Sequence, residues 1–233
     1  MNEIEFLKIK LQISENESKE FANWINMLGI DKCLEIYHNF VSVTNIEEPT
    51  FESVYSFYVY DTSLSEILFT LLRHSENHIK GFLSNVFNNY KVQIESRPSN
   101  YTKTKYYFKI PVGINEYLDI RTHNYDRGPV DYYDAIKTLD FGDVNLIMSH
   151  LPSSIISKFS SNSNIIKELD YTRKLRNYVY HHNLLFSLGL HELKEAIRLV
   201  LNNLPYDNLR IEYKEKINSL RNKDNLIHSI KIN

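Results

Sequence analysis

The sequence predicts a mainly α protein, an antiparallel helical bundle with a small β-hairpin insert. Apolar residues recur at 3–4 spacing through residues 64–87 and again through 162–186, as on amphipathic helices. Between these stretches, residues 90–128 change to alternating, β-favouring segments separated by Pro and Gly. A chain of 233 residues, 42% of them hydrophobic, is long enough for one good core.

The N-terminal part, residues 1–48, is expected to be a helical cap. Ser14 and Glu17 have the spacing of a capping box, so a helix should open there and stop at Gly29. A second helix is expected over residues 32–40. The remainder, residues 49–233, is expected to be a helical domain that carries the β insert at about 90–128.

Within this larger part, a helix over residues 50–60 and a long helix over 64–87 are expected to be separated by the polar run Asp61-Thr62-Ser63. Strand-like segments of the insert are residues 91–94, 106–110 and 117–121. Further helices are expected over residues 130–135, 144–150, 162–186, 189–203 and 206–221.

Charge is unevenly distributed although the formal net charge is only −2. Residues 1–50 carry nine Asp or Glu against four Lys, whereas residues 80–110 carry six Lys or Arg against one Glu. Tyrosines and a phenylalanine interleave with the basic residues of the second segment, a composition suited to phosphate contact and base stacking. A solvated hairpin, with Lys outside and aromatics inside, has the same composition.

Several classes of protein are disfavoured by the sequence. Cys33 is the one cysteine, so neither an intramolecular disulfide nor a thiolate metal site is expected. With 6 Gly, the chain has neither of the glycine-rich phosphate-binding patterns, and no cofactor is expected. The first residues lack a signal sequence, and no apolar run approaches a membrane span, so the protein is expected to be cytoplasmic without membrane contact.

An Arg-Asn pair and a His-His pair lie close together in residues 175–182. Arginine can hold a phosphate and histidine can move protons near neutral pH, so together they form a minimal set for cutting RNA without a metal. On a helix, Asn177 and His181 share a face, and the amide can orient the imidazole. Arg176 and His181 are about 140° apart around the axis, a separation that is relieved when the motif meets its own copy across a two-fold axis.

Two competing interpretations of the histidines stay open. The motif can be a solvated Arg-Asn turn beside two histidines packed under tyrosines. His74 and His78, four residues apart on the long helix, have a spacing that can chelate a metal, although exposed or interhelical histidines are the commoner case. That helix can also pack against the motif helix and bring Glu76 or Lys80 to the site.

Three blocks of the chain resemble the Abi-like family of bacterial abortive-infection proteins, whose C-terminal half is a helical domain of the HEPN type. They are residues 50–61, residues 139–144 and residues 175–182, in the family's order. Glu76 and Lys80 fall where the family shows a Glu and an Arg. The likeness spans roughly residues 15–205.

The chain departs from the family pattern at several places. After the His pair, Leu184 and Ser187 replace an Arg and an Asn. Lys80 keeps the charge of the usual Arg but loses its planar fork. A related HEPN class is silenced by nucleotidylation of a Tyr that corresponds to Asn183, so this form of control is not expected here.

The resemblance implies an HEPN-type endoribonuclease of abortive infection that uses no metal. His181 would act as general base on the ribose 2′-hydroxyl or as general acid on the leaving 5′-oxygen, with His182 as second choice. Arg176 would neutralise charge on the phosphorane, and Asn177 would orient the imidazole. Glu76 would have a supporting role.

RNA, a second copy in a homodimer, and an antitoxin RNA or protein are the expected partners. The residues expected to bind RNA are Lys80, Arg173, Lys174, Lys103 and Lys105. Two other functions stay open: a non-catalytic RNA-binding or sensing module on the same surface, and a structural dimer in which Arg176 and His181 satisfy buried partners.

Overall fold

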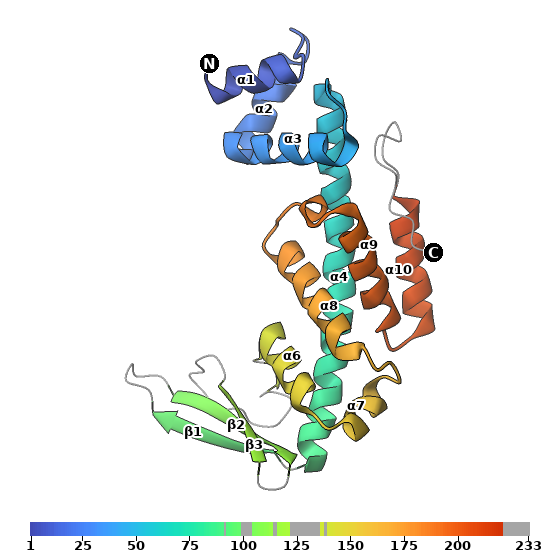
Figure 1. The fold of residues 1–233 in the computed structure, drawn as a ribbon. Coiled ribbons are helices and arrows are strands. Elements are labelled where there is room, and N and C mark those ends of the chain that lie inside the picture. Colours follow the sequence, from blue (N-terminus) through green and yellow to red (C-terminus); the bar gives the residue numbers. More distant parts are fainter. Residues whose placement is uncertain (91, 99–103, 114–115, 122–135, 138, 221–233) are drawn as a thin grey trace.

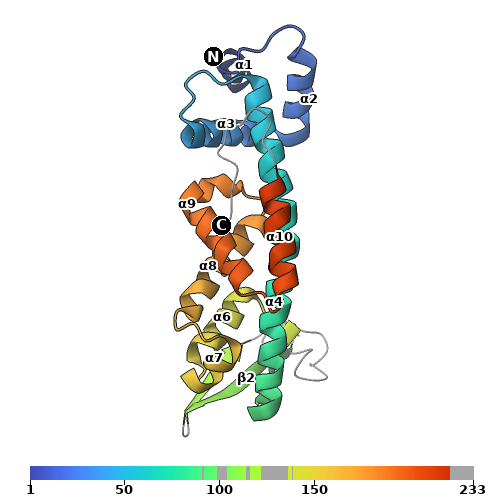
Figure 2. The ribbon, with the colours of Figure 1, turned by 90° about the vertical axis from the view of Figure 1, so that its right-hand side faces the viewer.

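The computed structural model describes residues 1–90, 92–98, 104–113, 116–121, 136–137 and 139–220. The protein is mainly helical, as predicted. The other elements are placed along one long helix, α4, which gives the molecule an elongated shape (Figures 1 and 2). The helix expected over residues 130–135 lies outside the described residues.

Helix α4 runs without a break over Phe51–Tyr90, so the prediction of two helices separated at residues 61–63 is wrong. The buried stripe passes straight through this place, because Phe57, Asp61 and Leu64 are all buried on one side. The carboxylate of Asp61 accepts hydrogen bonds from a distant segment of the chain and therefore does not compete for the backbone of its own helix.

Three helices at the N-terminal end of α4 form the cap region: α1 (Glu3–Lys10), α2 (Ser18–Leu28) and α3 (Ile30–Thr44) (Figure 1). The sequence patterns did not predict α1, which buries only Leu7. Its start is closed by Asn2, whose side-chain oxygen accepts a hydrogen bond from a backbone N–H of the first turn at 2.8 Å.

Ser14 and Glu17 make the carboxylate half of the expected capping box, but the helix opens about one turn later than predicted. The Glu17 carboxylate accepts hydrogen bonds from the Ser14 N–H at 3.0 Å and hydroxyl at 2.6 Å, and these bonds lower the pKa of Glu17. Helix α2 begins only at Ser18. It ends before Gly29, whose φ of 82° suits a residue without a Cβ, as predicted.

At the other end of α4 lies a three-stranded antiparallel sheet, β1 (Gln93–Pro98), β2 (Thr104–Gly113) and β3 (Glu116–Arg121), in the order β1-β2-β3. Strand β3 contacts helix α6, so the sheet lies beside this helix.

The C-terminal half is helical throughout its described part. Its elements are α6 (Phe141–His150), α7 (Ser153–Phe159), α8 (Ile165–Tyr180), the 3-10 helix η1 (Leu185–Leu188), α9 (Leu190–Asn202) and α10 (Asp207–Ser219). The expected single helix over 162–186 is therefore wrong at its end, because α8 stops at Tyr180 and the chain turns before η1. The Asp140 side chain caps α6 by accepting the Asp143 N–H at 2.8 Å.

Two hydrophobic clusters lie one after the other along α4. The first joins α1, α2 and α3 with residues 51–72 of α4 and with the later helices, including Leu175 and Val179 of α8. The second joins residues 79–87 of α4 with α6, α7 and the start of α8. Among the described residues, no helical segment, α4 included, has the length and apolar character that crossing a bilayer requires.

Candidate functional site

The two histidines of the motif form the turn that ends α8. His181 is the C-cap, and His182 has a left-handed φ of 54°. The His182 N–H donates to the Val179 carbonyl at 3.3 Å, and the Asn183 N–H donates to the Tyr178 carbonyl at 3.0 Å. These two bonds make a Schellman motif, in which the left-handed place is usually Gly. The expectation that the two histidines continue the helix is therefore wrong, because the helix ends at Tyr180. Both histidines are exposed.

Arg176, one turn before the helix end, lies at the seam between the two hydrophobic clusters. Its side chain is 23% exposed, and its Nε is 4.0 Å from Oε2 of Glu76 on α4. Glu76, 15% exposed, is also paired with Lys80 at 2.7 Å. The long helix therefore packs against the motif helix, as expected, and its Glu76 lies near both Lys80 and Arg176.

An aromatic ring fixes the direction of the Arg176 side chain. The guanidinium carbon lies 4.1 Å from the centroid of the Tyr180 ring, a cation–π distance. Tyr180 in turn stacks on Phe69 of α4, with centroids 4.8 Å apart. Burial raises the pKa of Tyr180, and the negative charge of Glu76 adds to this, while Arg176 opposes it. The guanidinium therefore lies over the ring and near the Glu76 carboxylate, while its buried Nε makes no hydrogen bond within the described part of the chain.

Asp61 is a buried residue with long-range contacts that the sequence patterns did not single out. Its carboxylate oxygen Oδ1 accepts the Leu185 N–H at 2.8 Å and the Phe186 N–H at 3.3 Å, at the start of η1. Burial raises the pKa of Asp61 to about 7, opposed by the two N–H donors. The signal in the sequence was a lone Asp on the apolar face of a helix, which is costly without partners.

Within one chain, the structure does not bring Arg176 and His181 together. Arg176 contacts Glu76 and Tyr180, and no hydrogen bond or ion pair joins it to His181, both residues being described. Asn177 contacts His181 through the backbone, because its carbonyl accepts the His181 N–H at 3.1 Å.

The residues expected to bind RNA have different surroundings. Arg173 donates two hydrogen bonds to Asp170, and Lys174 lies 3.6 Å from the same carboxylate, on the exposed side of α8. Lys80 is 12% exposed and held by Glu76, so its charge faces the protein. Lys103 and the side chain of Lys105 lie outside the described residues.

The His74 and His78 pair separates toward different helices. The His74 ring lies edge-on to Tyr213 of α10, and the His78 ring stacks on Phe159 of α7 at 5.1 Å. Burial lowers the pKa of His78. In the part of the chain that the structure describes, no group of three or more His, Cys, Asp or Glu has a geometry that could hold a metal.

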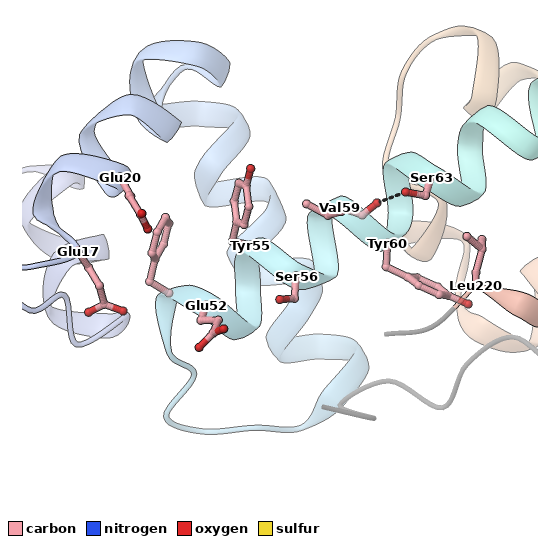
Figure 3. A pocket seen from close by; sticks show the side chains of 10 residues that line it. Glu17, Glu20, Glu52, Tyr55, Ser56, Val59, Tyr60, Ser63 and Leu220 are labelled. Carbon is pink, nitrogen blue, oxygen red and sulfur yellow. Dashed lines mark hydrogen bonds between the residues drawn. The ribbon is translucent and has the colours of Figure 1, made fainter. Parts of the chain in front are cut away.

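A pocket of about 620 Å³ lies away from the motif, between α2 and the first turns of α4 (Figure 3). Three carboxylates line it, those of Glu17, Glu20 and Glu52, together with Tyr55 and other residues of α4. Such a lining repels a phosphate chain, so this pocket is not a candidate for RNA.

Comparison with known protein families gives a match. The family model described as Abi-like protein matches residues 28–187, which is more than half of the chain and includes Glu76, Arg176 and both motif histidines. The protein therefore belongs to the Abi-like protein family. Membership of this family suggests a role in abortive infection. No curated protein and no solved structure was found to match this chain.

Proposed function

We propose that this protein is an HEPN-type endoribonuclease of abortive infection that cleaves RNA without a metal, by attack of the ribose 2′-hydroxyl. The observation that carries the proposal is the end of α8. There the Arg176 guanidinium, which lies near Glu76 and over the Tyr180 ring, precedes a turn whose two histidines are exposed. A fixed cation and a free proton carrier are what this reaction needs.

In the proposed reaction, His181 removes the proton of the 2′-hydroxyl, or the same residue of the second copy protonates the leaving 5′-oxygen. The 2′-oxygen forms a bond to phosphorus and the bond from phosphorus to the 5′-oxygen breaks. The products are a 2′,3′-cyclic phosphate and a free 5′-hydroxyl. Arg176 stabilises the charge on the phosphorane oxygens. His182 is the second choice for proton transfer, and the Asn177 amide is proposed to orient the imidazole.

A homodimer is part of the proposal. No direct contact joins Arg176 and His181 within one chain, and a second motif that faces the first across a two-fold axis would bring both kinds of group around one phosphate. Phe69, which stacks on Tyr180, and the two motif histidines are exposed, and they form the surface proposed for this contact. The proposed RNA contacts are Arg173, Lys174, Lys103 and Lys105. Lys80 is left out of this set because its ammonium is paired with the Glu76 carboxylate.

The test is cleavage of labelled RNA in EDTA by the wild type, His181→Ala, Arg176→Ala and His182→Gly. We expect EDTA-resistant cleavage that is lost in the first two variants by on the order of 100-fold or more. His182→Gly preserves the turn, since glycine accepts a left-handed φ, and it should retain cleavage if His181 carries the protons. Cleavage that disappears in EDTA would contradict the proposal.

A second function is favoured by the contacts of Arg176 within its own chain. A guanidinium that is already engaged by Glu76 and Tyr180 fits a non-catalytic RNA-binding or sensing module, held by an antitoxin RNA or protein. The same experiment separates the two, because RNA binding without cleavage identifies the module. Expression in a host adds a check, since a nuclease toxin should slow growth and His181→Ala should relieve it.

A further inference from the structure

We propose that Asp61 is a positioning residue for the motif histidines, holding the turn of His181 and His182 against α4. The effect of Asp61 on catalysis rests on the proposed nuclease function, whereas its effect on the position of the histidines does not. Asp61 closes the first of the three blocks that resemble the family, and the segment it holds directly follows the third. The contact therefore joins parts of the chain 124 residues apart.

The contact is buried and directional. Asp61 is 3% exposed, and one of its oxygens accepts two successive backbone N–H groups, those of Leu185 and Phe186. These groups open η1, where the first N–H donors of a helix lack partners within the helix. The carboxylate thus caps η1 from another helix. A carboxyl oxygen accepts hydrogen bonds whether or not the other oxygen is protonated, so the contact persists through titration.

Asp61 supplies what the end of α8 lacks by itself. The Schellman motif fixes the histidine turn to α8, but it does not fix the turn to α4. The Arg176 guanidinium lies beside Glu76 of α4. Asp61 and Glu76 therefore hold the turn and the guanidinium to the same rigid helix, and this sets how both groups are presented to a phosphate.

A lysine from the cap region supports the same turn. The Lys32 ammonium of α3 lies 3.5 Å from the His182 carbonyl and 2.8 Å from Glu35. The turn is thus contacted from α3 and from α4, on either side of the buried residue Leu184. The charges that face Asp61 are the positive charge of Lys32 and the negative charge of Glu35.

The first measurement needs no variant. Amide hydrogen exchange of the wild type should show slow exchange at Leu185 and Phe186, because both N–H groups are buried against the carboxylate. If both exchange at the rate of an unstructured peptide, the contact does not exist and the proposal is overturned, whatever the variants do.

The second measurement compares Asp61→Ala with Asp61→Asn, which keeps an acceptor oxygen at the same place. The controls are the wild type and Ile155→Ala, which removes core contacts in the second cluster, far from the turn. In Asp61→Ala, the NMR signals of the His181 and His182 imidazoles should shift and broaden, and kcat for RNA cleavage should fall on the order of 100-fold with KM little changed. Asp61→Asn should restore both, and Ile155→Ala should change neither at temperatures where it is folded.

The outcomes separate the two claims. Unchanged imidazole signals in folded Asp61→Ala overturn the positioning role, even if activity falls. Moved signals in a protein whose wild type does not cut RNA overturn the nuclease function and leave the positioning role standing. An equal loss of kcat in Ile155→Ala overturns the claim that Asp61 supports catalysis by positioning the histidines, because general destabilisation then accounts for the loss.

Discussion

The two acidic anchors of α4, Asp61 and Glu76, hold the two halves of one motif in different ways. Asp61 is buried in the first hydrophobic cluster and binds neutral backbone N–H groups. Glu76 lies at the seam between the clusters and faces the cations of Lys80 and Arg176. Desolvation of the carboxyl group is therefore the main electrostatic effect on Asp61, whereas attraction to two cations is the main effect on Glu76. A carboxylate used for position and one used for charge should respond differently to substitution and to pH.

The largest expected effect is that of Asp61→Ala on stability. The change leaves two buried N–H groups without an acceptor, at roughly 1–3 kcal/mol each. Urea unfolding at pH 6, where the folded carboxyl keeps its proton, should therefore show a loss of a few kcal/mol. Asp61→Asn, which still accepts both bonds, should lose much less. Equal losses in the two variants would mean that the acceptor oxygen does not matter.

The second expected effect is the contribution of Asp61 to the pH dependence of stability. Its pKa is raised from 3.8 to about 7 in the folded protein, because burial disfavours the charge. Below about pH 4 both the folded and the unfolded protein hold the proton. Between about 4 and 7 only the folded protein does, so each unit of rising pH removes about 1.4 kcal/mol of stability; above 7 the loss stops.

Urea unfolding of the wild type and Asp61→Asn at pH 5, 6, 7 and 8 measures this effect. The free energy of unfolding of the wild type, minus that of Asp61→Asn, should fall from pH 5 to 7 and level off beyond. A difference that is constant with pH would show that Asp61 ionises in the folded protein as readily as in the unfolded one.

The third expected effect is that of Glu76→Ala. Losing the shared carboxylate leaves the mostly buried charges of Lys80 and Arg176 facing each other, which should cost about 1.5–3 kcal/mol. Asp170→Ala is the matched control, because it breaks the exposed pair with Arg173, worth about 0.5 kcal/mol or less. Urea midpoints of the two variants measured side by side test this prediction. Similar losses in both would show that the mostly buried ion pairs of Glu76 contribute no more than the exposed pair of Asp170.

The smallest expected effect is a gain. His182 holds a left-handed φ of 54°, so His182→Gly should stabilise the protein by about 1 kcal/mol. His181→Gly is the control, because its φ of −96° gives glycine no advantage. A thermal melt compares the two. If His182→Gly is destabilising, its imidazole makes contacts that the turn depends on.

Local patterns predicted the helices well where an apolar stripe repeats. The 3–4 spacing gave most of α4 and α8, Gly29 gave the end of α2, and α9 and α10 were also predicted close to their observed bounds. Helix α1 escaped notice because it buries one residue, and the end of α8 was misplaced because His182 stands where glycine is the usual signal. The predicted division at residue 48 stays a prediction.

Part of the candidate site was also predictable. Arg176 and His181 were selected by their chemistry, and Glu76 by its place on the neighbouring helix. Asp61 was not selected, since its partners are backbone N–H groups that any residue provides, and they lie 124 and 125 residues away. The sequence marks such a contact only by an acidic residue on the apolar face of a helix, and it does not identify the partners of that residue.

The sequence by itself determined the helical class, the family membership and the set of chemical groups in the motif, because periodicity and residue type are local properties. Only the tertiary structure decided that α4 runs unbroken, that Arg176 lies between Glu76 and Tyr180, and that Asp61 holds the histidine turn. These are consequences of packing, in which a buried group takes whichever partner the folded chain brings to it.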